Sequence, residues 1–392
     1  MKRPWSIARL APIVVVAVAT LVYNTLPATT GVLARQLGFK PGTLGSFGSA
    51  DLLGMAVGAL AAMAVMRNTS PRATGVIGLA LLLAADFGSA ISGTAAALVP
   101  LRALGGVGAG LTVSAGYYMY SLEDQERNAA ASLFAQSALA VIVITAIPKL
   151  AHLLGWRSVF IGLGLLVVPC LLLARQFSAS YKESKALNVS DTAAATPAIL
   201  WLGLISSAMF NIAVAAFWTY VDGIGTATGI SEDDISRGLS ISTTMGLLGS
   251  VPVVVFGERI KAPIIFACVI LNIIGVVVSS SRIPWVYVTA ISAYSATLPI
   301  YFAVQFGAVM RRAASSRLAA KFTLSIYVGS LGPALGGLVA DQYGVPAVRW
   351  LVAVSTTLSA VLLWIGFFSS YGVRRYAGDG VAAHAKRDTV VS

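Results

Sequence analysis

Long apolar stretches recur along this chain, and they limit its fold more than any other feature. A helix needs about 20 mostly apolar residues to cross a bilayer. The chain is 57% hydrophobic and only 11% charged, whereas soluble proteins carry about 25% charged residues. The pattern predicts an all-α integral membrane protein with twelve transmembrane helices, at about 11–33, 44–66, 73–92, 97–119, 129–150, 157–174, 199–220, 238–256, 263–281, 285–309, 319–339 and 347–369.

The lysines and arginines are distributed unevenly between the two sides of the predicted membrane. If both termini lie on one side, that side holds 19 of the 27 basic residues and the opposite side holds seven. Cytoplasmic segments carry the excess of basic residues, so we expect both termini in the cytoplasm of a multi-pass protein of the cell (inner or plasma) membrane. The net charge of +12 then faces lipid headgroups, and no nucleic-acid partner is needed to explain it.

The longest connecting segment, residues 176–198, is charged and separates six predicted spans from the other six. It divides the chain into an amino-terminal bundle of residues 1–175 and a carboxyl-terminal bundle of residues 199–372. Residues 373–392 are polar and are expected to form a cytoplasmic tail.

Residue types that bind metals or cofactors are scarce. The two cysteines, Cys170 and Cys268, each lie inside an apolar run, and the two histidines are far apart in sequence. Gly106, Gly108 and Gly110 lie inside a span, whereas a nucleotide-binding glycine loop follows a strand. The sequence therefore predicts no metal, no cofactor and no enzymatic activity.

Three of the predicted spans each contain a different short motif. The fourth has Arg102-Ala-Leu-Gly105-Gly106-Val-Gly108-Ala-Gly110, the sixth opens with Gly155-Trp156-Arg157-Ser158-Val159-Phe160, and the eleventh has Gly332-Pro333-Ala334-Leu335-Gly336-Gly337. Together with the span count and the central loop, they resemble the major facilitator superfamily of secondary transporters. One departure is the loop Met66–Arg72, which lacks the aspartate that this family carries there.

The resemblance implies two pseudo-symmetric six-helix bundles that work by alternating access, in a protein that is a monomer by the family's default. It also implies that spans 1, 4, 7 and 10 line a central substrate site. In such positions the sequence offers the polar side chains of Tyr23, Asn24, Asn211, Tyr294, Tyr301 and Gln305. The last three lie on one helical face at spacings of seven and four, and the alternative interpretation of this stripe is packing. We expect Gly106, Gly110, Gly332, Pro333, Gly336 and Gly337 to serve close helix packing or gating.

Only Asp51, Asp86 and Arg102 are charges well inside the predicted spans. Counted at about 1.5 Å per residue, all three lie in one layer near the outer third of the membrane, on three consecutive helices. A charge inside the membrane faces the protein interior and marks proton or ion pathways by default. Arg102 can neutralise one aspartate, which leaves the other available to carry a proton. The alternative is a static ion-pair network that holds the helices together.

These observations predict a secondary active transporter that moves a small organic molecule across the membrane by alternating access, with protons as the coupling ion. The substrate is expected to be an organic or aromatic acid or a hydrophobic, drug-like compound. The main alternative is a facilitator without ion coupling, in which the intramembrane charges are structural. A receptor-like sensor built on a transporter scaffold is a further alternative.

Overall fold

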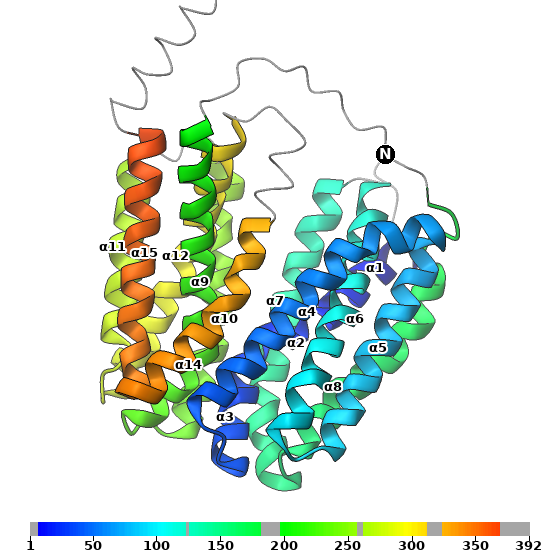
Figure 1. The fold of residues 1–392 in the computed structure, drawn as a ribbon, viewed down its shortest axis with the longest axis horizontal. Helices are drawn as coiled ribbons and strands as arrows, with labels where there is room; N and C mark the ends of the chain where they lie inside the picture. Colours follow the sequence, from blue (N-terminus) through cyan, green and yellow to red (C-terminus); the bar gives the residue numbers. More distant parts are fainter. Residues whose placement is uncertain (1–6, 123–124, 182–196, 257–261, 312–323, 369–392) are drawn as a thin grey trace, which may run out of the picture.

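The computed structural model describes residues 7–122, 125–181, 197–256, 262–311 and 324–368, and it is helical throughout these ranges except for short turns (Figure 1). Parts of the predicted central loop (182–196) and the whole predicted tail lie outside the described residues. The main helices are α1 (Ile7–Ala19), α2 (Leu21–Asn24), α3 (Leu26–Leu37), α4 (Pro41–Asn68), α5 (Pro71–Ile91), α6 (Ala95–Ser121), α7 (Gln125–Leu154), α8 (Arg157–Leu173), α9 (Pro197–Ala227), α10 (Glu232–Phe256), α11 (Ala262–Val278), α12 (Pro284–Arg311), α14 (Leu331–Tyr343) and α15 (Val348–Leu363).

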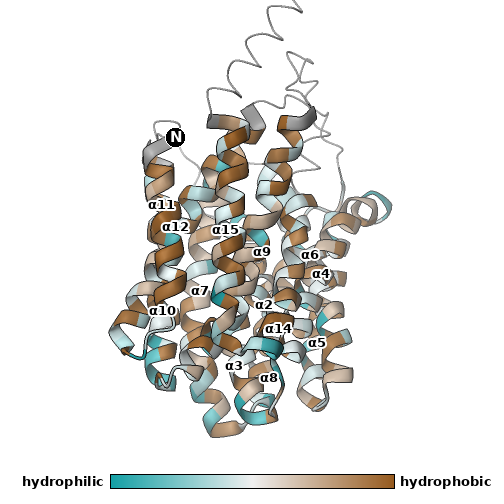
Figure 2. Ribbon diagram, turned by 60° about the vertical axis from the view of Figure 1, so that its left-hand side comes forward, coloured by the Kyte–Doolittle hydropathy of each residue, from teal (hydrophilic) through white to brown (hydrophobic). Residues whose placement is uncertain are grey.

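The twelve predicted spans correspond to helical segments wherever the structure describes them; residues 319–323 of the eleventh and residue 369 of the twelfth lie outside the described residues. Nine helices of the described chain are long and apolar enough to cross a membrane, and the bent first span makes a tenth. The other two expected spans correspond to α10, which begins with Glu232, Asp233 and Asp234, and to α11, which has only 17 residues. The architecture is therefore the predicted all-α membrane fold. Large apolar side chains such as Leu165 and Leu338 are 59% and 61% exposed, and a bilayer would cover them. Hydrophobic residues recur along the helices of both bundles (Figure 2).

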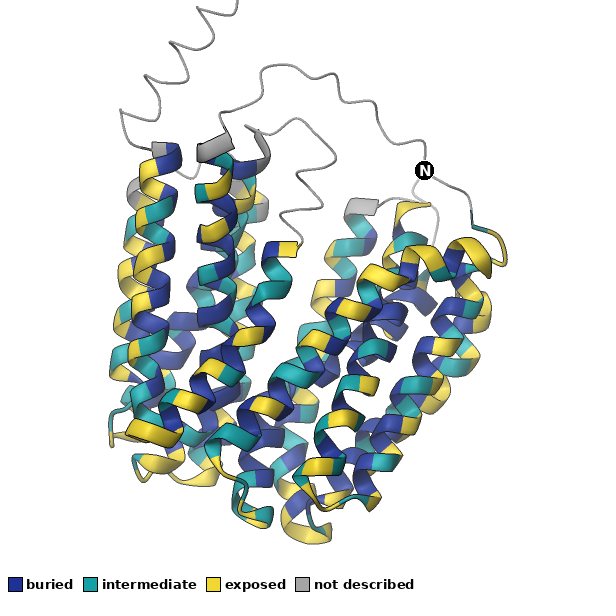
Figure 3. Ribbon diagram, viewed as in Figure 1, coloured by how far each residue is buried: buried dark blue, intermediate teal, exposed yellow. Residues whose placement is uncertain are grey.

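The helices form two bundles, α1 to α8 and α9 to α15 (Figure 1). The bundles touch at one end of the molecule, where α4 packs against α14, α3 against α9 and α7 against α10, and they diverge toward the other end. A core of buried side chains runs through each bundle and across their contact, while the outer faces are exposed (Figure 3). We call the end at which the bundles touch the closed end.

The first span is broken into α1, α2 and α3, with a bend of 44° before α3. Pro27 has no N–H, so it cannot donate to the carbonyl oxygen of Tyr23 four residues earlier. That oxygen instead accepts a hydrogen bond from the indole Nε1 of Trp218 in the other bundle, at 3.2 Å. The hydroxyl of Thr25 also bonds to the carbonyl of Leu21, a local contact that bends helices. The break therefore ties the two bundles together at the middle of the molecule.

Glycines let α4 and α6 cross in backbone contact. A side chain on Gly106 would collide with the carbonyl oxygen of Asp51, and one on Gly110 with the carbonyl oxygen of Met55. Gly54 and Gly58 on α4 face the α6 backbone in the same way. Small residues at this spacing let membrane helices approach closely, as the sequence motifs indicated.

We expect Gly110→Ala to destabilise the protein by about 1–3 kcal/mol, because overpacking a tight contact forces the backbones apart. The added carbon would lie 2.7 Å from the Ala59 nitrogen, which belongs to the backbone and cannot rotate away. Gly162→Ala is the matched control, since its nearest neighbour is the end of the Leu150 side chain at 4.0 Å. Thermal unfolding in detergent measures both variants, and equal midpoints would contradict the packing argument.

Candidate functional site

The three predicted intramembrane charges come together inside the amino-terminal bundle. Arg102 Nη2 donates to Asp86 Oδ1 at 2.9 Å, and Arg102 Nε lies 4.0 Å from Asp51 Oδ1. The three residues are almost completely buried, with 1–3% of their surface exposed. The guanidinium also lies 5.2 Å from the centre of the Phe160 ring on α8. One arginine on α6 therefore joins α4, α5 and α8.

The two aspartates have unequal surroundings. Asp86 accepts a direct hydrogen bond from Arg102, whereas Asp51 Oδ1 and Arg102 Nε are buried without any hydrogen-bond partner. From the sequence, we expected that Arg102 would neutralise one aspartate and leave the other short of a partner. In the structure, the aspartate without a direct hydrogen bond to Arg102 is Asp51. Asp51 is attracted to Arg102 only across 4.0 Å, without a hydrogen bond at Oδ1, so its negative charge is less well compensated than that of Asp86.

A cavity of about 340 Å³ lies between the bundles. Its position follows from α4. The Ser49 hydroxyl donates to the carbonyl oxygen of Ser330, just before α14, at 2.6 Å, and accepts from the Ala334 N–H of α14 at 3.0 Å. Leu52 and Met55 line the cavity one to two turns further along α4, toward the opposite end of the molecule, which we call the open end. Four spans of the two bundles besides α4 contribute to its wall. The lining residues are Tyr23, Leu52, Met55, Asn211, Val214, Ala215, Phe302, Ile326, Tyr327, Gly329 and Ser330.

Two of the six expected substrate-lining residues, Tyr23 and Asn211, are part of this wall, and Asn24 is not. Asn211 Nδ2 donates to the carbonyl oxygen of Ser207 at 2.9 Å, a contact within its own helix. Tyr327 and Phe302 line the cavity but were not among the six expected residues. Their aromatic character was visible in the sequence, but their orientation was not.

The other three expected lining residues, on α12, lie inside the carboxyl-terminal bundle. Tyr294 packs on Phe217 with ring centres 4.3 Å apart. The hydroxyl of Tyr301 bonds to Ser359 Oγ at 2.8 Å, and Gln305 Nε2 donates to Ser206 Oγ at 2.7 Å. These contacts join α9, α12 and α15, so the tyrosine stripe packs helices together and does not contribute to the cavity wall.

An ion pair that sequence reasoning missed joins the bundles at the closed end. Arg35 Nη1 on α3 donates to Asp222 Oδ1 on α9 at 2.7 Å, and Arg35 Nε lies 2.8 Å from Glu232 Oε1. Asp222 lies beyond residue 220, where the seventh span was expected to end, so it was not among the intramembrane charges expected from the sequence, yet it is 2% exposed. The helix continues to Ala227. The sequence feature that could have indicated this ion pair is the presence of opposite charges near the same ends of spans 1 and 7.

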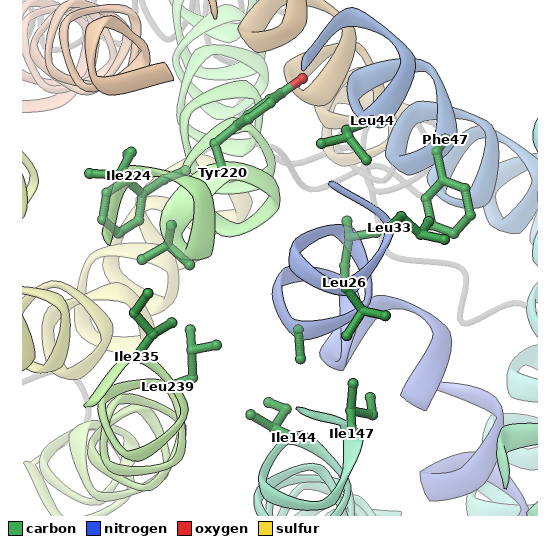
Figure 4. Packing of buried hydrophobic residues seen from close by; sticks show 14 of the residues in the cluster. Leu26, Leu33, Leu44, Phe47, Ile144, Ile147, Tyr220, Ile224, Ile235 and Leu239 are labelled. Carbon is green, nitrogen blue, oxygen red and sulfur yellow. The ribbon is translucent and has the colours of Figure 1, made fainter. Parts of the chain in front are cut away.

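Backbone groups complete the closed end. The Tyr220 hydroxyl donates to the carbonyl oxygens of Pro41 and Pro333, at 2.7 and 3.1 Å, and the Gly42 N–H at the start of α4 donates to Asp341 Oδ1 at 3.0 Å. A carboxylate at a helix amino terminus is favourable because the helix dipole is positive there. Figure 4 shows buried hydrophobic side chains of α3, α4, α7, α9 and α10, including Tyr220, that belong to one core cluster shared by the two bundles.

The glycines and proline of the eleventh span lie where this closure needs close approach. A side chain on Gly336 would meet the Tyr220 ring, and one on Gly337 would lie 2.9 Å from the Gly42 Cα in the other bundle. Gly332 faces the α9 backbone, and the carbonyl of Pro333 holds Tyr220. Among the described residues, no group of three or more histidine, cysteine, aspartate or glutamate side chains could hold a metal ion.

No protein-family model and no curated protein matches this sequence. Solved structures match over most of its length. A nucleoside transporter, NupG, matches with a TM-score of 0.72 at 13% sequence identity, and the match covers 92% of this chain and 98% of the NupG chain. A D-xylose–proton symporter has a TM-score of 0.70 at 14% identity, covering 93% and 98%. A bacterial homologue of the human lysosomal transporter Spinster, inward-facing and occupied, has a TM-score of 0.68 at 12% identity, covering 91% and 96%.

Proposed function

We propose that this chain, whose fold is that of major facilitator transporters, carries a small organic molecule across the cell membrane by alternating access, driven by protons. The main support is a cavity walled by both bundles, combined with contacts between the bundles that lie to one side of it. In each of its two states, an alternating-access carrier must open its substrate cavity to one side of the membrane only. The solved transporters of like fold are consistent with this activity.

We assign the open end, opposite the closed end, to the cytoplasmic side of the membrane. The helix ends at the closed end, including the end of α3 and the turn between α7 and α8, carry basic residues that the charge distribution assigns to the outer side (Figure 1). The conformation would then be inward-facing, with Arg35 and Asp222 holding the outer gate. The Spinster homologue of similar fold was solved in an inward-facing conformation.

Proton coupling is proposed to act through Asp51, because α4 connects the charge group to the rest of the transport machinery. Ser49 holds the opposite bundle, Asp51 lies beside Arg102, and Leu52 and Met55 form part of the cavity wall. A proton on Asp51 removes its attraction to Arg102 and changes how α4 is held against α6. The same helix would transmit that change to the cavity and to the contact between the bundles.

The test uses proteoliposomes and the compound that most raises the thermal stability of the purified protein in a screen of organic acids, sugars, cations and uncharged aromatics. We expect an inward proton gradient to drive its accumulation. Asp51→Asn should reduce gradient-driven accumulation at least about ten-fold while leaving exchange of the compound across the membrane near the wild-type rate, since the carrier still has both of its states.

Asp233→Asn is the matched control, because Asp233 is exposed at the start of α10 and outside the charge group. It should leave both rates unchanged. If Asp51→Asn also leaves accumulation unchanged, or if the wild-type protein ignores the gradient, the chain is a facilitator. The direct bond between Asp86 and Arg102 would then be a structural ion pair that joins α5 to α6.

A further inference from the structure

We propose that the cavity between the bundles selects an uncharged, mainly apolar molecule, and so excludes the organic acids that the sequence left open. This inference rests on the proposed transport function and narrows its substrate class. It comes from the chemistry of the cavity wall, from where the neighbouring charges lie, and from the volume of the cavity.

Among the described residues, the cavity wall has no charged side chain. Its polar side chains are Tyr23, Tyr327, Asn211 and Ser330, all neutral, and the rest of the wall is aliphatic or aromatic apart from Gly329. The Asn211 amide already donates one hydrogen bond to the carbonyl oxygen of Ser207. Such a wall can orient a ligand through one or two neutral hydrogen bonds, and it offers apolar contact everywhere else.

The charged residues between and inside the bundles lie outside the cavity wall. Asp51 precedes the wall residue Leu52 and accepts no hydrogen bond at Oδ1, but it lies 4.0 Å from Arg102 Nε inside the amino-terminal bundle. Arg102 bonds to Asp86 and lies over the Phe160 ring inside the amino-terminal bundle. Arg35 and Asp222 pair with each other at the closed end, beyond the contact of Ser49 with α14. None of these charged residues is part of the cavity wall. Among the described residues, the cavity wall therefore offers no counter-charge to a carboxylate or ammonium group that loses its hydration there.

That loss decides the substrate class. Binding an ion without a counter-charge is strongly unfavourable because the ion loses its hydration. A hydrogen bond to an uncharged group changes the binding free energy little or lowers it slightly. The cavity of about 340 Å³ is near the lower end of ligand pockets, about 300–1,000 Å³. A neutral compound of one or two rings, with one hydrogen-bonding group, matches both the volume and the wall.

The first experiment compares three ligands of nearly equal size and different charge: indole-3-acetamide, indole-3-acetate and tryptamine. Binding to the purified wild-type protein is measured by thermal stabilisation and by isothermal titration. We expect the neutral amide to bind at least about ten-fold more tightly than either ion, a difference of about 1.4 kcal/mol. Tighter binding of the acetate or of tryptamine would overturn the inference.

Asn211→Asp introduces an acid into the cavity wall with little change in shape, and it should shift the preference toward tryptamine. Asn68→Asp is the control, because Asn68 is exposed at the end of α4 and does not line the cavity. It should leave the order of the three ligands unchanged. The same shift in both variants would mean that the ligands bind elsewhere, which also overturns the inference.

A second measurement reports on the cavity without any ligand. Val214→Cys places a thiol in the wall, and the two native cysteines are buried. The thiol is reacted with neutral, anionic and cationic methanethiosulfonates, and each rate is divided by the rate of the same reagent with free mercaptoethanol. We expect both charged reagents to be slower than the neutral one by at least about ten-fold. A charged reagent that matches or exceeds the neutral one would contradict an uncharged site.

Transport assays separate failure of this inference from failure of the proposed function. If indole-3-acetamide binds most tightly but shows no counterflow in proteoliposomes, the transport function fails and the binding class stands. If an ionic member of the series is both bound best and carried, the transport function stands and the substrate class is overturned.

Discussion

Replacing Arg102 with leucine is expected to destabilise the protein by about 3–5 kcal/mol, the cost of breaking a buried ion pair and leaving its partner charged. Arg102 holds Asp86 at 2.9 Å and Asp51 at 4.0 Å, and all three side chains are shielded from water. Without the guanidinium, two aspartates would remain in the bundle interior with no counter-charge. The measurement is the free energy of unfolding in mixed detergent micelles, from a denaturant titration.

Arg237→Leu is the matched control, because Arg237 is also ion-paired but 72% of its side chain is exposed. Such a surface pair contributes only about 0–1 kcal/mol. The double variant Asp86→Leu/Arg102→Leu should recover much of the loss, since it removes the pair rather than half of it. Equal losses in Arg102→Leu and Arg237→Leu would show that the charge group does not stabilise the bundle.

Asp222→Asn is expected to open the closed end of the molecule. The bond from Arg35 to Asp222 links α3 to α9 across the two bundles and is charge-assisted. Hydrogen bonds to charged groups contribute about 1.5–3 kcal/mol, so its loss should raise the population of the opened state by about ten- to a hundred-fold. A cysteine in place of Thr219, which is 1% exposed, should react faster with N-ethylmaleimide by the same factor.

Two further variants make this result specific. Asp234→Asn removes an acid that pairs with Arg237 inside α10 and does not join the bundles, so it should leave the labelling rate at Thr219→Cys unchanged. The exchanged pair Arg35→Asp/Asp222→Arg should restore slow labelling. An unchanged rate in Asp222→Asn would mean that the apolar packing and the contacts of Tyr220 and Asp341 hold the closed end without the ion pair.

The charge group could be predicted because its position depends on counting. The start of each span and the rise of a helix place Asp51, Asp86 and Arg102 at one depth, and the cost of a lone charge in the membrane requires that they face inward and meet. The geometry of the group, with Asp86 bonded and Asp51 left at 4.0 Å, depends on side-chain directions. Those directions follow from the packing of α4 on α6, which the sequence does not specify.

The tyrosines of α12 and the buried Asp222 show where counting no longer suffices. A spacing of seven places Tyr294 and Tyr301 on one face of a helix, but it does not say whether that face meets the cavity or another helix. The partner of Tyr301, Ser359, is 58 residues away. The helix of the seventh span continues beyond residue 220 to Ala227, and its buried Asp222 pairs with Arg35, 187 residues away in the sequence.

From the sequence alone we could predict a helical membrane protein with twelve apolar segments, three interior charges in one half and motifs that resemble a transporter family. These properties depend on hydropathy and on length along one helix, and a bilayer imposes both locally. The tertiary structure decided which end is closed, which residues line the cavity and which aspartate lacks a partner. These depend on how two bundles meet, and contacts between residues far apart in the chain leave no periodic signal in it.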